Sequence, residues 1–280
     1  MNSIKKMMLS GALGCLISGM AYADGSSPQP VKPYWQDIQV VAVNKEKPRS
    51  SFMSYADRET ALTSRFEKSP YYFLLNGTWK FFFVDSYKDL PQNITDPSVN
   101  TSSWDDITVP GNWEVQGHGV AIYTNHGYEF KPRNPQPPLL PEANPVGVYR
   151  RDIEIPASWD NRDIYLHIGG AKSGLYVYLN GKEVGYSEDS KNPAEFLINK
   201  YLQPGKNVLT LKIFRWSTGS YLECQDFWRM SGIERDVFLW SQPKASIQDF
   251  RVVSTLDDTY TNGIFKLAVD LKNHTQETKN

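Results

Sequence analysis

The amino-acid sequence predicts an all-β protein, in which a β-sandwich or jelly roll is followed by an incomplete immunoglobulin-like β-sandwich. Short runs rich in β-branched and aromatic residues recur over residues 51–243, and Gly, Pro, Asn or Asp bound each run. Helical periodicity is almost absent. At 280 residues with 40% hydrophobic content, the chain can also bury a sizeable core.

The first 23 residues have the pattern of an export signal. Lys5 and Lys6 precede an apolar run, and Ala21-Tyr22-Ala23 fits the small-residue rule for cleavage. We expect cleavage after Ala23 and a periplasmic or secreted protein. The apolar run is too short to span a membrane, and no second span follows. A lipoprotein attached through Cys15 is the alternative.

Charge and cysteine content narrow the classes of partner. The formal net charge is −1, and no cluster of Lys and Arg is suited to phosphates, so nucleic acid is excluded as a partner. Removal of the signal leaves Cys224 as the one cysteine, so no internal disulfide is expected. We expect Cys224 to be a partly buried small side chain, with a reactive thiol as the alternative. The spacing of His and Cys is not that of a metal cluster.

The expected elements begin after a polar, proline-containing lead, residues 24–50, which is predicted to be extended. The sandwich region, residues 51–243, opens with two apolar runs around Asn76-Gly77, a hairpin or tight-turn signal. Further along, apolar residues and tyrosines alternate over residues 175–179. Asn180-Gly181 follows them and fits a type I′ turn between two strands.

A proline-rich loop interrupts this rhythm. Residues 131–145 carry six prolines, which lack the amide donors that a central strand needs. Loops of this length are usually functional or contact another domain, with a plain surface excursion as the alternative.

A second domain is expected to begin after Pro243. Residues 247–256 and 263–273 are predicted strands, and in the second of them apolar Phe265, Leu267, Val269 and Leu271 alternate with other residues. Two strands cannot bury an apolar face by themselves. We therefore expect residues 244–280 to be the start of a truncated immunoglobulin-like domain, or to depend on another chain.

The segment 215–237 mixes aromatic rings, carboxylates and arginines. A sugar site requires this combination, because pyranose C–H faces stack on rings while hydroxyls need fixed polar partners. The candidate stacking surfaces are Trp216, Tyr221, Phe227 and Trp228, and the candidate polar contacts are Glu223, Gln225 and Asp226. In the alternative interpretation the aromatic residues belong to the hydrophobic core. Arg215, Arg229 and Arg235 then form structural ion pairs with the acidic residues.

Five motifs occur together in a fixed order. They are NGTWKF (76–81), VPGNWEVQGHGVAIYTN (109–125), NPVGVYRRDIEIP (144–156), LNGKEVGYSEDSKNPAEF (179–196) and RWSTGSYLECQDFWRMSGIERDV (215–237). Together they resemble the amino-terminal sugar-binding domain of family 2 glycoside hydrolases, of the large bacterial β-galactosidase type. The resemblance covers roughly residues 70–243. It implies a galactose-binding-like jelly roll, followed in similar enzymes by an immunoglobulin-like domain and a catalytic (β/α)₈ barrel.

The resemblance also implies roles for two residues. Asn125 and Asp226 occupy the positions whose side chains contact galactosyl hydroxyls in similar enzymes, and Asp226 is also expected near a bound Na⁺. An amide can donate and accept, while a carboxylate suits a hydroxyl donor or a hard cation. A turn residue is the alternative for Asn125, and a salt bridge for Asp226. Cys224 departs from the acid often found at its position, and Glu223 is expected to be structural.

No catalytic residue is expected in this chain. Retaining glycosidases need two carboxyl groups about 5 to 5.5 Å apart, whereas Glu188-Asp189 and Asp105-Asp106 are predicted to be solvated turn residues. In similar enzymes both catalytic glutamates and a Mg²⁺ site lie in the barrel. We therefore expect the chain to be the sugar-binding portion of a retaining β-galactosidase and to be inactive alone. A homo-oligomer is a candidate assembly. The alternatives are a stand-alone carbohydrate-binding module and part of a β-glucuronidase or β-mannosidase.

Overall fold

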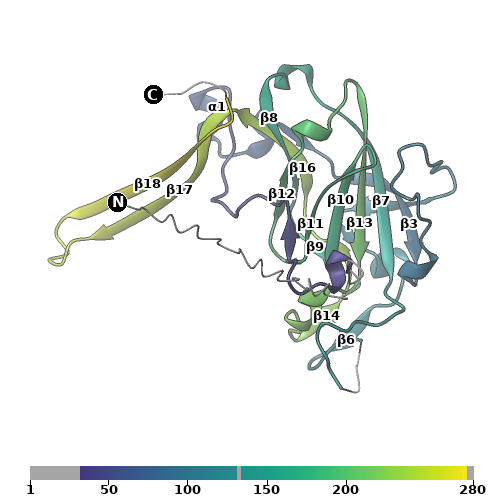
Figure 1. Cartoon of the computed structure of the whole chain (residues 1–280). Coiled ribbons are helices and arrows are strands. Elements are labelled where there is room, and N and C mark those ends of the chain that lie inside the picture. Colours follow the sequence, from purple (N-terminus) through teal and green to yellow (C-terminus); the bar gives the residue numbers. More distant parts are fainter. Residues whose placement is uncertain (1–31, 131–133, 276–280) are drawn as a thin grey trace, which may run out of the picture. The chain divides into compact units, whose positions relative to one another are not determined.

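The computed structural model describes residues 32–130 and 134–275 (Figure 1). The predicted signal, residues 1–23, lies outside the described residues. Strands dominate the described part, in which the one α-helix, α1 (Arg58–Leu62), has five residues. The prediction of an all-β protein is therefore confirmed. Over these same residues, no helix has both the length and the apolarity that crossing a membrane requires.

Two antiparallel sheets form the sandwich, in the orders β1-β11-β10-β13-β7-β3-β4 and β12-β8-β16-β2. The larger sheet consists of β1 (Ala42–Val43), β3 (Gly77–Val84), β4 (Asp105–Val109), β7 (Val146–Glu154), β10 (Gly174–Leu179), β11 (Lys182–Ser187) and β13 (Lys206–Phe214). The smaller sheet consists of β2 (Tyr72–Leu74), β8 (Arg162–Ile168), β12 (Ala194–Leu197) and β16 (Val237–Pro243). Neighbouring strands are often distant in sequence, which agrees with the predicted jelly-roll class.

Smaller elements complete the described part. The short strands are β5 (Gly111–Asn112), β9 (Ala171–Lys172) and β15 (Gly232–Ile233) in one sheet, and β6 (Ile122–Thr124) with β14 (Phe227–Arg229) in a two-stranded ribbon. The last pair is β17 (Ala245–Leu256) with β18 (Gly263–Asn273). The 3₁₀ turns are Tyr34–Gln36, Phe66–Lys68, Tyr87–Asp89, Glu114–Gln116, Ala157–Trp159, Asn199–Tyr201 and η7 (Thr218–Tyr221).

The main core lies between the two sheets. Alternation with period 2 sends one set of side chains from each strand inward. In β10 these are Leu175, Val177 and Leu179, all nearly inaccessible, as the sequence pattern predicts. Trp79 and Trp113 join the same cluster, and large rings of this kind dominate the burial of apolar area.

A second cluster covers the outer face of the larger sheet. Trp35 from the predicted lead is 1% exposed, and its ring stacks on Phe214 at a centroid distance of 5.0 Å. Tyr176, on the outer face of β10, belongs to this cluster. The prediction of an extended lead omitted these contacts. Residues 34–36 form a 3₁₀ turn, Trp35 packs on the larger sheet, and residues 42–43 form its edge strand β1.

The two Asn-Gly signals have different outcomes. At Asn180-Gly181 both φ angles are positive, 53° and 77°, and the turn joins the antiparallel strands β10 and β11 as predicted. At Asn76-Gly77 the flanking strands belong to different sheets, so this is a tight crossing and not a hairpin. The Asn76 side chain bonds both Asp236 and the amide of Val237, which fixes the crossing beside β16.

The predicted strands after Pro243 are confirmed as one antiparallel hairpin, β17–β18. The hairpin is attached near its base, where Asp249 accepts a hydrogen bond from the Ser50 amide and His274 Nδ1 lies 2.7 Å from Asp163. The alternating apolar residues of β18 are exposed, with Phe265 at 67% and Leu271 at 77%.

Candidate functional site

The ribbon β6–β14 brings the two predicted contact residues together. Its antiparallel register pairs Thr124 with Phe227 and Tyr123 with Trp228. Asn125 directly follows Thr124 and Asp226 directly precedes Phe227, so the two residues flank the last pair of the ladder. Two positions that lie 101 residues apart in the sequence are therefore brought to the same end of the ribbon.

One face of this ribbon carries both polar and aromatic groups. Tyr123 and Trp228 are directly opposite each other and share a face of the ribbon. Asp226 bonds the Tyr123 hydroxyl, and Asn125 lies two positions beyond Tyr123 in the chain. All four residues are exposed. The Tyr123 and Trp228 rings are 5.5 Å apart between centroids, a spacing typical of favourable ring contacts. We call these four residues the ribbon face.

Local hydrogen bonds orient the two polar groups of the ribbon face. The Tyr123 hydroxyl donates to Asp226 Oδ1 at 3.2 Å, which raises the pKa of Tyr123 through the hydrogen bond and the negative charge. His126 Nδ1 lies 2.7 Å from Asn125 Oδ1. Within residues 32–130 and 134–275, the Asp226 carboxylate thus meets the neutral hydroxyl of Tyr123 and forms no ion pair with an arginine.

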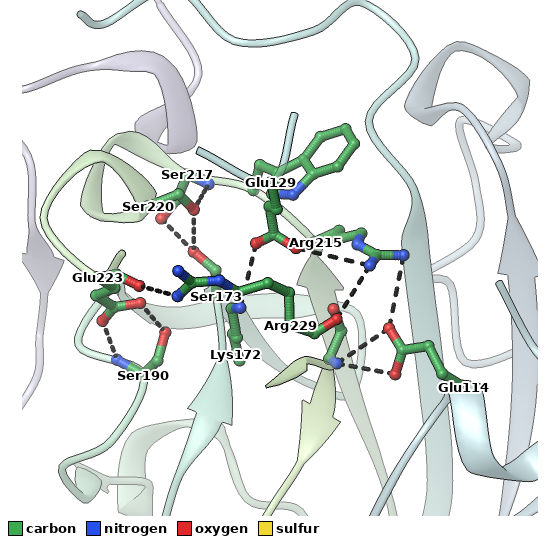
Figure 2. A network of polar contacts seen from close by, with 12 residues as sticks. Glu114, Glu129, Lys172, Ser173, Ser190, Arg215, Ser217, Ser220, Glu223 and Arg229 are labelled. Carbon is green, nitrogen blue, oxygen red and sulfur yellow. Dashed lines mark hydrogen bonds and ion pairs between the residues drawn. The ribbon is translucent and has the colours of Figure 1, made fainter. Parts of the chain in front are cut away.

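A buried polar network lies next to the ribbon (Figure 2). Arg215 lies between two carboxylates, 3.6 Å from Glu114 Oε1 and 3.6 Å from Glu129 Oε2. Lys172 Nζ approaches Glu129 Oε1 at 3.2 Å. These four side chains are at most 6% exposed, so the charges face one another with little solvent. We call them the charged floor.

The charged floor is bonded to the ribbon through the backbone. Arg215 Nη2 donates to the carbonyls of Val120, just before β6, and of Arg229, within β14. Burial raises the pKa of Glu114, although the Ser231 amide donates to both of its oxygens. The floor therefore sets the position of both strands.

The mixed segment 215–237 combines both interpretations of its sequence. Trp216 and Tyr221 are 8% exposed and belong to the interior, whereas Trp228 is 52% exposed. Arg215 forms ion pairs with two glutamates, as the interpretation with structural ion pairs predicts. Arg229 and Arg235 instead donate to the carbonyls of Glu223 and Lys191, which corrects that part of the interpretation.

The two predicted solvated acid pairs differ. Asp105 and Asp106 are exposed, at the start of β4. Glu188 is only 3% exposed, so its assignment as a solvated turn residue was wrong. It accepts bonds from the Tyr186 and Thr218 hydroxyls and from the Gly219 amide. Those donors lie mostly about 30 residues away, where the sequence does not reveal them.

Other predicted residues lie near the ribbon but off its exposed face. Glu223 accepts two bonds from Ser190, as a structural residue does. Cys224 is half-buried, as expected. The sequence interpretation missed Tyr123, although the alternation in Ile122–Thr124 followed by Asn125 could have indicated that it shares a face with Asn125.

The residues of the ribbon face are compatible with a partial cation site. Asp226 and Asn125 offer carboxylate and amide oxygens, which hard cations prefer. Among the described residues, however, no group of three or more His, Cys, Asp or Glu is placed to hold a metal. A Na⁺ ion at Asp226 would therefore need further oxygen ligands. The Mg²⁺ implied for a longer enzyme finds no cluster of that kind in the described part.

The fold is an antiparallel β-sandwich, a class that includes lectin domains. A family model described as glycosyl hydrolases family 2, sugar binding domain, matches residues 73–243. The chain belongs to this family.

Relatives and solved structures agree with this assignment. A β-galactosidase of Priestia megaterium is 40% identical over 86% of this chain and 24% of its own length. A β-galactosidase of Actinobacillus pleuropneumoniae is 39% identical over 84% of this chain and 22% of its own length. The chain thus spans about a quarter of these relatives. The crystal structure of a β-glycosidase from Bacteroides vulgatus shares the fold, with a TM-score of 0.55 at 22% identity over 74% of this chain and 25% of that one.

Proposed function

We propose that this chain is the amino-terminal sugar-binding part of a β-galactosidase that releases terminal non-reducing β-D-galactose with retention. The observation that supports the proposal is the register of β6 and β14, whose last pair, Thr124 with Phe227, is flanked by the exposed residues Asn125 and Asp226. Relatives that are 36–42% identical and named β-galactosidase support the choice of substrate.

Each residue of the ribbon face has a chemical role in this proposal. Asn125 donates to and accepts from a galactosyl hydroxyl, while Asp226 accepts from a hydroxyl or ligates Na⁺ with oxygens from elsewhere. Tyr123 holds Asp226 Oδ1 and thereby orients the carboxylate. A bound Na⁺ would supply positive charge for a sugar oxygen.

The bond-breaking acids are assigned to a barrel domain outside this chain. Glu188 is the most buried acid of the two adjacent acid pairs. Its carboxylate accepts three hydrogen bonds within the chain and is 3% exposed, so a sugar does not reach it. The two catalytic glutamates and Mg²⁺ would then belong to the barrel. The sequence of residues 1–23 further favours export and work in the periplasm or outside the cell.

Hydrolysis of a chromogenic β-galactoside tests the proposal. The chain alone is expected to be inactive, and a protein that joins it to its family-type barrel is expected to be active. Asp226→Ala in the active protein should lower kcat/KM by about tenfold to a hundredfold, since bonds to a charged group contribute roughly 1.5–3 kcal/mol. Asp258→Ala is the matched control, because Asp258 is an exposed carboxylate between β17 and β18. Equal activity of both variants would remove Asp226 from the site.

The exposed ring pair favours one other candidate, a stand-alone carbohydrate-binding module. Tyr123 and Trp228 are 57% and 52% exposed, as rings that stack on sugars must be. Calorimetry of the chain with galactose separates the two candidates. Saturable binding that Trp228→Ala abolishes would support the module, whereas a composite site shared with a barrel predicts little heat.

A further inference from the structure

Two segments behind the ribbon face are joined by a reciprocal pair of buried carboxylates. Residues 188–190 follow β11, and residues 217–223 contain η7 and lead toward Asp226. Glu188 of the first segment bonds the second, and Glu223 of the second bonds the first. The connection therefore has two ends, each with a carboxylate on a different segment.

The first end is at Glu188. Its Oε2 accepts the Thr218 hydroxyl and the Gly219 amide, both at 2.7 Å, and its Oε1 accepts the Tyr186 hydroxyl at 2.7 Å. A Cβ at Gly219 would lie 3.3 Å from Glu188 Oε2, so the close approach favours glycine. The start of η7 is thereby fixed to the end of β11.

The second end is at Glu223, which lies three residues before Asp226. Its Oε1 accepts the Ser190 amide at 2.9 Å and its Oε2 accepts the Ser190 hydroxyl at 2.6 Å. The Glu223 carbonyl accepts from Arg229 Nη1 at 3.0 Å, and Arg229 is 1% exposed in β14 (Figure 2). The segment before Asp226 is thus held from β11 and from β14 together.

We propose that Glu188 and Glu223 are positioning residues that set the orientation of Asp226 and of the whole ribbon face. We call the hydrogen bonds of Glu188 and Glu223 to the opposite segments the clamp. The role of Asp226 rests on the proposed function, whereas the clamp is a property of this chain. Five hydrogen bonds converge on these two carboxylates, while residues 222, 225 and 226 beside Glu223 are exposed. Without the clamp, the exposed segment would have few contacts to hold it.

The bonding geometry indicates which variants keep the clamp. Gln presents one acceptor and one donor, and each carboxylate faces at least one hydroxyl that can accept instead of donate. Burial raises the pKa of both Glu188 and Glu223, so replacement by neutral Gln also removes buried charge. Lys172 lowers the pKa of Glu223, while Asp189 raises it. Gln should preserve the segment, and Ala should release it.

Amide exchange measured by NMR on the 280-residue chain tests the proposal. The amides of Ser190 and Gly219 donate directly to the carboxylates and report each end. Glu223→Ala should speed exchange at Ser190 and at residues 227–229 by about tenfold or more, as loss of bonds to a charged group implies. Glu188→Ala should do the same at Gly219. Both Gln variants should stay within about threefold of the unchanged chain.

A second signal reports the ribbon face itself. The indole N–H resonance of Trp228, assigned by its absence in Trp228→Phe, should shift in Glu223→Ala and return in Glu223→Gln. Ser190→Ala, which removes one bond only, provides a milder variant if Glu223→Ala does not fold. Asp258→Ala, which removes an exposed carboxylate between β17 and β18, is the matched control and should change neither signal.

Two outcomes would overturn the clamp. One is that the Ala variants speed amide exchange at residues 227–229 by no more than they speed it in core strand β13. Such a parallel increase reflects a general loss of stability. The other is a Trp228 resonance that does not respond in either Ala variant or in Ser190→Ala. Neither measurement uses a sugar, so failure of the galactosidase proposal, seen with Asp226→Ala, remains a separate result.

Discussion

The sandwich core and the charged floor stabilise neighbouring parts of the molecule by different means. The core joins two sheets through side chains such as Trp79 and Leu209, each 1% exposed, with volume and shape as the main requirement. The charged floor joins the ribbon to the sandwich through Arg215, Glu114 and Glu129. Removing one partner of a buried ion pair destabilises the fold more than replacing the whole pair by apolar residues. The core should therefore tolerate isosteric changes, and the floor should tolerate only changes that leave no charge unpaired.

The largest expected effect is in the core. Trp113 is fully buried, its indole N–H donates to the Tyr149 hydroxyl, and it packs so closely that a Cβ at Gly147 would lie 2.6 Å from its ring. Trp113→Ala should lower the free energy of unfolding by about 4 kcal/mol, the usual cost of a large cavity. Urea denaturation measures this loss. A loss below about 1 kcal/mol would show that the site collapses around the smaller residue.

The next effect tests the charged floor. Arg215→Met keeps much of the side-chain volume but leaves Glu114 and Glu129 without their shared cation, so we expect a loss of about 3 kcal/mol. Adding Glu114→Gln to Arg215→Met should recover part of that loss. Urea denaturation of both variants measures the difference. Equal stability of Arg215→Met and the unchanged chain would contradict the contrast between floor and core.

The sequence was sufficient where contacts are local or periodic. Alternation along β10 and β18 and the turn at Asn180-Gly181 depend on neighbours within a few residues, and these predictions are confirmed. It was insufficient where the partner is remote. The crossing at Asn76-Gly77 was open to interpretation because β2 pairs with β16, about 165 residues away along the chain.

The candidate site divides in the same way. Asn125 and Asp226 were chosen by resemblance, and the ladder of residues 122–124 with 227–229 brings both to the same end of the ribbon only in the folded chain. The burial of Glu188 could not be seen, since an acid beside Asp189 reads as polar surface until its remote donors are known.

A smaller effect concerns pH and separates two buried carboxylates. Burial raises the pKa of Glu188 above 4.5, so this group stabilises the fold fully below about pH 4.5 and less as pH rises through its folded pKa. Burial also acts on Glu195, but hydrogen bonds from His167 and Arg49 outweigh it and lower its pKa. Glu195 therefore stabilises the fold above pH 4.5, and that contribution is lost as pH falls through its folded pKa.

Substitution should reveal these opposite signs. Relative to the unchanged chain, Glu188→Gln should be more stable at pH 7 and lose that advantage near pH 4. Glu195→Gln should be less stable at pH 7, with a deficit that shrinks toward pH 3. Urea midpoints across this range provide the measurement. A shift of both variants in the same direction at pH 7 would contradict the assignment.

The smallest effect is expected in the β17–β18 hairpin, whose apolar residues on β18 are largely uncovered by the part of the chain that the structure describes. Phe265 is 67% exposed and lies opposite Ser254, so Phe265→Ser loses little buried area. The change should alter the free energy of unfolding of this chain by less than about 0.5 kcal/mol, as at other exposed positions. Urea denaturation at two protein concentrations is the appropriate measurement. A loss above about 1 kcal/mol that grows with concentration would mean that a second copy covers this face in solution.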